Sequence, residues 1–199
     1  GYGMTEVCGI ITYIAGDVFV ERPSSCGYLA PTFDGKVVDE TGKELPIGEL
    51  GEICVKGAAV IKGYLNRPEA TADTIVDGWL HTGDVGLIDD RGFVFVKDRI
   101  RDVVITGGFN VYPNDVEAVL GQHPDVSECV VFGLPDDKWG EVPCAFIEMV
   151  KDKPASEKDL IDFCKETLAG FKVPKQVIFC ELPKTSTGKI QKFELRKKF

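Results

Sequence analysis

The sequence predicts an α+β protein in which a small β-barrel-like unit is followed by a compact α+β unit with a small mixed sheet and flanking helices. Three observations support this fold class. Short apolar runs punctuated by glycine turns fill residues 1–97. Strand-type runs alternate with two segments of helical spacing in residues 98–199. A charged stretch at residues 98–102 separates the two parts, and about 100 residues is an ordinary size for one domain.

The first part contains short apolar runs of strand type and one helix start. Asn66 and Pro68 predict a helix entry, with asparagine as the cap and proline just inside the helix. Asp84 follows Thr82 and Gly83 in what we expect to be a turn before a strand. The expected strands are residues 36–39, 52–55, 85–89 and 93–96, with turns at 41–43 and 89–92.

The second part alternates strands and helices. Gly107 and Gly108 follow a short strand and allow backbone conformations that are closed to other residues. Pro113 stands where a first helical position is expected. Ser156 is the expected cap of a later helix, which Gly170 ends and which carries a buried stripe of Leu160, Phe163, Cys164, Thr167 and Leu168. The expected strands are residues 103–105, 126–133, 142–150 and 177–180, and the helices are 114–122 and 156–170.

Composition excludes several classes of function. The 199 residues include 32 acidic and 23 basic side chains, a formal charge of −9, which gives no electrostatic footprint for nucleic acid. No apolar run is long enough to form an integral membrane segment. Seven cysteines without a CxxC pair indicate reduced, buried thiols and a cytoplasmic location. The spacing of histidines and cysteines predicts no zinc-type cluster and no catalytic triad.

The first six residues contain parts suited to a nucleotide pocket. The ring of Tyr2 can stack on a base, the hydroxyl of Thr5 can donate to a phosphate, and the carboxylate of Glu6 can hold Mg²⁺. A plain turn is the alternative interpretation of this short segment.

Two further residues suggest contacts with a nucleotide. Asp84 can either cap a turn or hold a diol such as ribose through its two acceptor oxygens. Lys189 lies in a hydroxyl-rich loop with Gly188, where a compact ammonium group suits a phosphate. The loop lacks the GxxxxGK[ST] spacing of a Walker loop, and a solvated loop is the alternative.

Five short motifs occur in the order found in acyl-adenylate-forming enzymes, and the chain resembles the C-terminal part of an acyl-CoA synthetase. The run Gly-Phe-Asn-Val-Tyr-Pro at residues 108–113 is most similar to fatty acid–CoA ligases. The motifs are residues 1–6, 48–52, 78–84, 98–113 and 183–190.

The resemblance implies roles for individual residues. Tyr2 would flank adenine, Asp84 would hold the ribose hydroxyls, and Arg99 would contact ribose or phosphate. Thr5 would contact the α-phosphate during catalysis, and Glu6 would bind Mg²⁺. The implied nucleotide-binding set is Tyr2, Gly3, Thr5, Asp84, Arg99 and Lys189.

The resemblance also implies a moving domain. Residues 1–97 would end the large ATP- and acyl-binding domain, and residues 98–199 would form the small mobile domain. Lys189 would be the catalytic lysine of adenylation. Arg101 falls at the pivot of domain rotation, where the family usually has Asp or Lys. Gly107 and Gly108 would line the tunnel for the pantetheine of CoA.

The implied reaction uses ATP, Mg²⁺ and CoA to convert a carboxylic acid, with a fatty acid favoured, to its CoA thioester. The family's phosphate loop and most of its acyl pocket lie upstream of the motif at residues 1–6. We therefore expect the chain to be a fragment that needs the missing N-terminal region and is inactive alone. The alternatives are an adenylation domain that loads a carrier protein and a non-catalytic binding or interaction domain.

Overall fold

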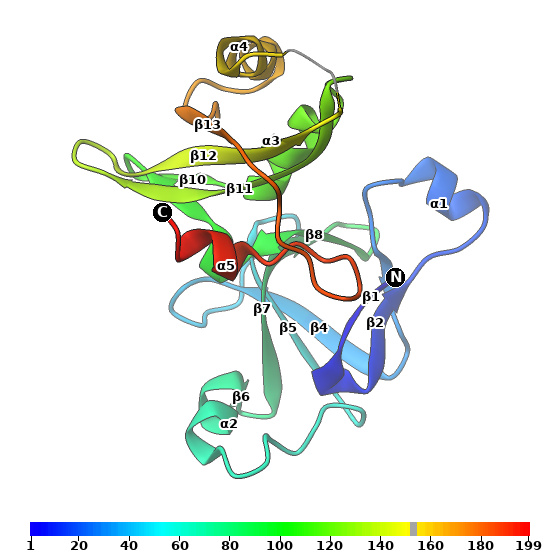
Figure 1. Cartoon of the computed structure of the whole chain (residues 1–199). Coiled ribbons are helices and arrows are strands. Elements are labelled where there is room, and N and C mark those ends of the chain that lie inside the picture. Colours follow the sequence, from blue (N-terminus) through cyan, green and yellow to red (C-terminus); the bar gives the residue numbers. More distant parts are fainter. Residues whose placement is uncertain (152–154) are drawn as a thin grey trace. The chain divides into compact units, whose positions relative to one another are not determined.

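The chain divides into two units, Gly1–Ile100 and Arg101–Phe199, in this computed structural model, which describes residues 1–151 and 155–199 (Figure 1). The boundary falls within a short 3-10 helix, Ile100–Asp102. Each unit has a core of its own and is described by itself. None of the described helices is both long enough and apolar enough to span a membrane.

The first unit is built on one antiparallel sheet. The strand order is β1-β2-β3-β8-β7-β5-β4, and β6 pairs with β7. Two short helices, α1 (Asp17–Glu21) and α2 (Pro68–Thr74), lie in its connections. The strands are β1 (Tyr2–Met4), β2 (Gly9–Tyr13), β3 (Gly27–Leu29), β4 (Phe33–Val38), β5 (Gly51–Gly57), β6 (Ile75–Val76), β7 (Trp79–Ile88) and β8 (Phe93–Arg99).

This sheet is open and does not close into a barrel. The prediction of a β-barrel-like unit was wrong in this respect. A closed barrel requires its first and last strands to pair. Within residues 1–151 and 155–199, β1 pairs only with β2 and β4 only with β5. The three-residue length of β1 gives little backbone with which a second partner strand could pair.

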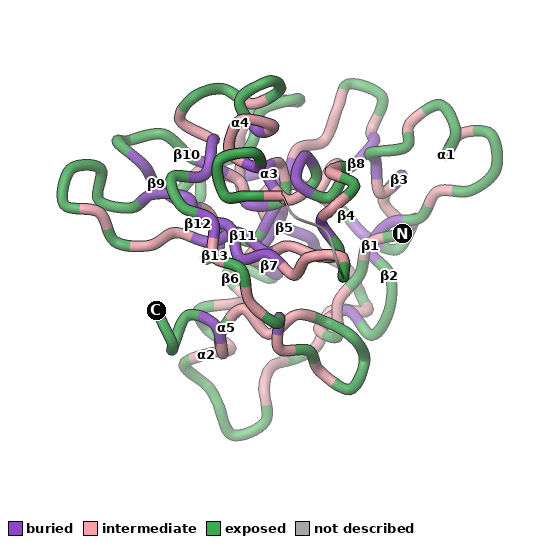
Figure 2. The backbone as a smooth tube through the Cα atoms, turned by 45° about the horizontal axis from the view of Figure 1, so that its top comes forward, coloured by how far each residue is buried: buried purple, intermediate pink, exposed green. Residues whose placement is uncertain are grey.

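One face of the sheet carries the core of the first unit. Residues of β7 alternate between buried and half-buried, as expected for a strand with two different faces. Leu80 packs on the core face with Ile53 and Val55 of β5. Figure 2 shows that buried residues follow the strands, whereas α1 contains no buried residue.

The described part of the second unit combines a mixed sheet with three α-helices. The order is β10-β9-β12-β11, and β13 pairs in parallel with β12, so the predicted mixed sheet with flanking helices is present. The elements are β9 (Val104–Thr106), β10 (Phe109–Val111), α3 (Pro113–Leu120), β11 (Val126–Asp136), β12 (Gly140–Met149), α4 (Glu157–Thr167), β13 (Gln176–Phe179) and α5 (Lys192–Arg196).

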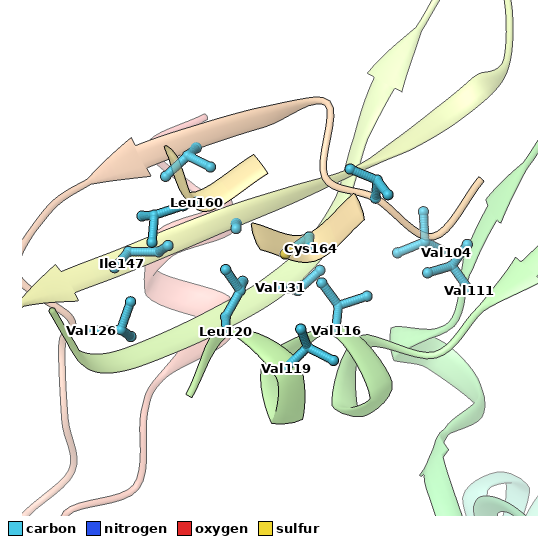
Figure 3. Packing of buried hydrophobic residues seen from close by; sticks show 13 residues of the cluster. Val104, Val111, Val116, Val119, Leu120, Val126, Val131, Ile147, Leu160 and Cys164 are labelled. Atoms are coloured by element: carbon cyan, nitrogen blue, oxygen red, sulfur yellow. The ribbon is translucent and has the colours of Figure 1, made fainter. Parts of the chain in front are cut away.

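The two faces of this sheet are covered by different helices. Val131 and Ile147 face α3 and α4, whose residues Leu120 and Leu160 complete one core cluster (Figure 3). On the opposite face, Phe132 and Phe146 stack with ring centroids 4.2 Å apart, and Leu195 of α5 is buried with them. Burial of both faces explains the consecutive apolar residues in the middle of these strands, residues 129–134 of β11 and 142–147 of β12.

Several local predictions hold and others need correction. Ser156 caps α4 through a capping box with Asp159, as its position in the sequence predicted. That helix ends at Thr167, before Gly170, and Thr167 itself is exposed. Asn66 has φ of 56° and lies outside α2, whose cap is the next residue, Arg67.

Two further predictions were wrong. Residues 82–84 belong to β7 and not to a turn, because the strand begins earlier, at Trp79. Cys54, Cys144 and Cys164 are buried, but Cys8 is exposed, so burial does not extend to all the cysteines.

Candidate functional site

Asp84 lies on the core face of β7 and pairs in register with Arg99 at the end of β8. Oδ1 of Asp84 is 3.3 Å from Nε of Arg99. The aspartate side chain is only 7% exposed, whereas that of the arginine is 54% exposed. The pair therefore joins a buried carboxylate to a guanidinium group that solvent or a ligand can reach.

The side chain of Tyr2 meets the same carboxylate from the far end of the sheet. Its hydroxyl donates to Oδ2 of Asp84 at 2.6 Å. Four strand steps separate β1 from β7 in the sheet order, which would be about 19 Å in a flat sheet with strands ~4.8 Å apart. The sheet must therefore curve strongly, and this curvature assembles Tyr2, Asp84 and Arg99 in one place.

Burial and the hydrogen bond to Asp84 fix the protonation state of Tyr2. Burial raises the pKa of the Tyr2 hydroxyl well above its usual value, and the bond to Asp84 raises it further, whereas Thr82 and Arg99 act weakly in the opposite direction. The hydroxyl is therefore a proton donor at neutral pH. Thr82 also holds the backbone of β7, since its Oγ1 donates to the carbonyl of Ile53 at 2.7 Å and accepts from the amide of Asp84 at 3.1 Å.

These contacts leave Asp84 able to accept further hydrogen bonds. Each carboxylate oxygen has two acceptor positions, and Tyr2 and Arg99 each engage a different oxygen. Two neighbouring hydroxyl groups of a ligand can donate to the remaining positions. The exposed Arg99 can meet an anionic group of the same ligand.

Glu6 stands in the short 3-10 helix Thr5–Val7 that follows β1. Its Oε1 accepts a hydrogen bond from the hydroxyl of Tyr64 at 2.9 Å, and its carbonyl accepts from the amide of Ile61 at 2.8 Å. Burial, and then the bond to Glu6, raises the pKa of Tyr64. A half-buried carboxylate held in this way suits Mg²⁺, which takes one or two protein carboxylates and completes its shell with water and phosphate oxygens.

Thr5 and Gly3 flank these residues, and both are exposed. Gly3 has a structural reason to be glycine, since a Cβ there would lie 2.2 Å from the carbonyl oxygen of Gly9. The close pairing of β1 with β2 requires this absence of a side chain. Thr5 directly precedes Glu6 in the 3-10 helix.

Lys189 belongs to the second unit, in a tight loop closed by a bridge between Lys184 and Ile190. Thr185 holds this loop, because its amide donates to the carbonyl of Lys189 at 2.8 Å and its Oγ1 accepts from the amide of Lys189 at 3.1 Å. Gly188 has φ of 82°, which permits the turn. The backbone of Lys189 is therefore fixed while its side chain is exposed.

Arg101 is exposed and begins the second unit. Gly107 and Gly108, with φ of 55° and 85°, form the two-residue turn of the β9–β10 hairpin, a turn that requires positive φ at both positions. A Cβ at Gly107 would lie 2.7 Å from the ring of Trp139, whereas a Cβ at Gly108 would meet nothing within 4 Å. Gly108 therefore presents open backbone at the tip of the hairpin.

A second cluster was missed by the sequence analysis, which predicted no grouping of histidine with cysteine. Glu52 and Cys54 of β5 and His81 of β7 lie together on the face opposite the core. The signal available in sequence was the alternation of these residues with buried Ile53 and Leu80. Alternation does not give the register between two strands, and the contact depends on that register.

Two family models match the chain. Residues 1–65 match the model of the AMP-binding enzyme, and residues 115–189 match the model of the AMP-binding enzyme C-terminal domain. Together they include Tyr2, Glu6 and Lys189.

Curated relatives match nearly all of the chain. A 2-succinylbenzoate–CoA ligase of Bacillus cytotoxicus is 46% identical over 197 residues, which are 98% of this chain and 40% of the relative. A long-chain-fatty-acid–CoA ligase of Escherichia coli O6:H1 is 43% identical over 98% of this chain and 35% of its own length. The chain thus spans about 40% or less of the length of these relatives.

Solved structures of a similar protein contain ligands. The o-succinylbenzoate CoA synthetase of Bacillus subtilis, in complex with an acyl-adenylate intermediate, matches 98% of this chain and 40% of its own, with a TM-score of 0.91 and 40% identity. A second structure of that enzyme, with ATP and magnesium ion, matches with a TM-score of 0.89 and 39% identity.

Proposed function

Because the chain belongs to the AMP-binding enzymes and carries parts of both their domains, we propose that it is the C-terminal portion of an AMP-forming acyl-CoA ligase. Such an enzyme joins a carboxylic acid to the α-phosphate of ATP, releases pyrophosphate, and passes the acyl group to the thiol of CoA. The single observation that carries the proposal is the grouping of Tyr2, Asp84 and Arg99 in a chain with these relatives.

The ribose and base of ATP would bind beside Asp84. Its free acceptor positions suit the two ribose hydroxyls, and the ring of Tyr2 would lie against adenine. The guanidinium of Arg99 is exposed and would contact ribose or phosphate. Gly3 would contribute backbone next to the nucleotide.

The α-phosphate would lie near the segment that follows β1. The Thr5 hydroxyl would donate to an α-phosphate oxygen, while Glu6 would hold Mg²⁺, which lowers the repulsion between the phosphates and the incoming carboxylate. The hydroxyl of Tyr64 orients the Glu6 carboxylate for this task.

Lys189 is proposed as the catalytic residue of adenylation. Its ammonium would bridge the attacking carboxylate and the α-phosphate, where negative charge builds up in the transition state. The two hydrogen bonds between Thr185 and Lys189 fix the loop backbone, so only the side chain of the lysine loses freedom when it engages.

The second step requires different surroundings from the first. We propose that the second unit rotates about Arg101 between the two steps, and that Gly107 and Gly108 then line the path of the CoA pantetheine. Open space at Gly108 supports this role, because a thin chain needs close approach to backbone.

The names of the relatives suggest two classes of acid substrate. The sequence analysis favoured a fatty acid, but the relatives include both a 2-succinylbenzoate ligase and a long-chain-fatty-acid ligase at nearly equal identity. The test is acid-dependent exchange of labelled pyrophosphate into ATP by the full-length protein, with 2-succinylbenzoate and fatty acids of several lengths. Exchange with one class is expected, and no exchange with any acid would overturn the proposal.

A further inference from the structure

The face of the first sheet opposite its core carries three potential metal ligands that the proposed nucleotide site does not use. Cys54 of β5 and His81 of β7 are directly paired across the strands, and Glu52 lies on the same face of β5. One ligand atom from each residue lies within 4.8 Å of the other two. The antiparallel register, not the spacing in sequence, creates this cluster.

The distances between these atoms are close to those of a tetrahedral cation site. Sγ of Cys54 is 3.5 Å from Nδ1 of His81, and Oε2 of Glu52 is 2.7 Å from the same nitrogen. Ligands at about 2.1 Å from a tetrahedral zinc ion lie roughly 3.4 Å from one another. The cysteine and histidine already have this separation, and the glutamate oxygen lies about 0.7 Å closer to the histidine nitrogen than in such a site.

The surroundings of the cluster fix the Glu52 carboxylate, leave His81 partly exposed and bury Cys54. Oε1 of Glu52 accepts a hydrogen bond from the amide of Gly83 at 3.0 Å, which orients the carboxylate toward His81. The side chains of Glu52 and His81 are 18% and 24% exposed, and Cys54 lies buried beneath them. A cation can therefore enter from the histidine side and reach the thiol.

The cluster contains one acidic side chain, because Glu52 contributes a carboxylate that attracts a cation. Lys36, the cross-strand neighbour of Cys54, opposes a cation in principle. Its Nζ lies 4.4 Å from the ring centroid of Trp79, so the ammonium group makes a cation–π contact with the indole.

We propose that Glu52, Cys54 and His81 form a binding site for a divalent transition-metal cation such as Zn²⁺ or Co²⁺, with water as the fourth ligand. A thiolate and an imidazole select such an ion over Mg²⁺, which prefers oxygen ligands alone. Binding forms one bond from the metal to each of Sγ, Nδ1 and Oε2, and it releases the thiol proton of Cys54 to solvent. The site bridges β5 and β7 and is independent of the Mg²⁺ proposed at Glu6.

The test is titration of the 199-residue chain with Co²⁺ in Mg²⁺-containing buffer, followed by displacement with Zn²⁺. A sulfur-to-metal charge-transfer absorption should appear at one equivalent and disappear when zinc replaces cobalt. Cys54→Ser should remove this absorption and weaken zinc binding by about 100-fold or more. Cys144→Ser is the matched control, because Cys144 is equally buried. This variant should change neither the absorption nor the zinc affinity.

A second measurement tests the site without relying on the folding of Cys54→Ser. X-ray absorption of the zinc-loaded wild-type chain should find one sulfur and the remaining neighbours nitrogen or oxygen. The melting temperature of the wild type should rise with zinc, and that of Glu52→Gln should rise less. Absence of the cobalt–sulfur absorption, a zinc shell without sulfur, or unchanged zinc affinity in Cys54→Ser would overturn the proposal.

Discussion

The hydroxyl of Tyr2 donates to Asp84 at 2.6 Å although 82 positions of sequence separate the two residues. The contact ties the first strand of the chain to the strand that carries the buried carboxylate. Because Arg99 engages the other oxygen of Asp84, three elements far apart in the sequence meet at one side chain. In our account this meeting point is where the ribose of ATP binds.

Replacing Tyr2 by phenylalanine removes the hydroxyl from this contact. We expect a loss of about 1–2 kcal/mol in the free energy of unfolding of the first unit, because a mostly buried carboxylate loses a donor. Denaturant titration of the two chains measures the loss. Tyr13→Phe is the control, since Tyr13 is 50% exposed, and an equal effect of both changes would contradict the account.

The same pair predicts a dependence on alkaline pH. The folded pKa of Tyr2 is raised above its ordinary value of 10.0, so its contribution to stability is fully present below pH 10 and is lost as the pH rises toward the folded pKa. The stability difference between wild type and Tyr2→Phe should therefore shrink above about pH 10. A stability difference between wild type and Tyr2→Phe that grows as the pH rises above about 10 would contradict this prediction.

Asp84→Asn should weaken the use of ATP. If Asp84 accepts from the two ribose hydroxyls as proposed, replacing its charge by an amide removes a hydrogen bond of about 1.5–3 kcal/mol, which corresponds to roughly a 10- to 100-fold loss in kcat/KM for ATP. Steady-state kinetics of the full-length protein measures this loss in kcat/KM. Asp89→Asn is the matched control, because Asp89 is also paired with an arginine, Arg22, but lies at the β7–β8 turn.

Lys189→Ala should abolish adenylation selectively. Loss of the charge proposed to bridge the carboxylate and the α-phosphate should lower acyl-adenylate formation by about 10²–10³-fold, while thioester formation from supplied acyl-adenylate remains. Acetylation of Lys189 should act likewise. Lys197→Ala is the control at another exposed lysine, and equal loss in both half-reactions of Lys189→Ala would refute the assignment.

Arg101→Pro and Gly108→Leu should have the opposite selectivity. Proline resists the backbone rotation proposed at residue 101, and a leucine at Gly108 fills the path proposed for pantetheine. Both should spare pyrophosphate exchange and lower thioester formation by about 100-fold. Gly42→Leu is the control, since Gly42 has a similar φ of 82° and open space around it. Full CoA ligation by Arg101→Pro would place the pivot elsewhere.

The 199 residues alone should bind ATP poorly. They contain the proposed contacts to adenine, ribose and α-phosphate, but not the phosphate loop that the family resemblance assigns to the preceding region. Exposed charge contacts contribute only ~1 kcal/mol each, so we expect a Kd no tighter than about 1 mM and no release of pyrophosphate. Calorimetry with Mg-ATP measures the affinity, and micromolar binding would contradict the expectation.

Local patterns in the sequence predicted much of the second unit. The capping box at Ser156, the proline that begins α3 and the apolar runs of β11 and β12 are short-range signals, and each corresponds to an element of the structure. The β10 strand was missed because Phe109–Val111 is short and follows two glycines.

The sites depended on information that a local pattern does not contain. The proximity of Tyr2 to Asp84 arises from curvature of a sheet with β1 at its edge. The meeting of Cys54 with His81 arises from the register of β5 against β7. Side-chain chemistry and resemblance to a family supplied Asp84 and Tyr2 as candidates, but neither composition nor spacing supplied Glu52, Cys54 or His81 as a group.

The proposed reaction begins with attack of a carboxylate oxygen on the α-phosphate of ATP. The most direct test is to supply the full-length protein with an acid labelled with ¹⁸O in both carboxylate oxygens, together with ATP, Mg²⁺ and CoA. If an acyl-adenylate forms and the thiol of CoA displaces AMP from its carbonyl carbon, one labelled oxygen must remain on the phosphate of AMP and the other in the thioester. Mass spectrometry of the AMP should detect that label. Unlabelled AMP, or label in inorganic phosphate accompanied by ADP, would contradict the account.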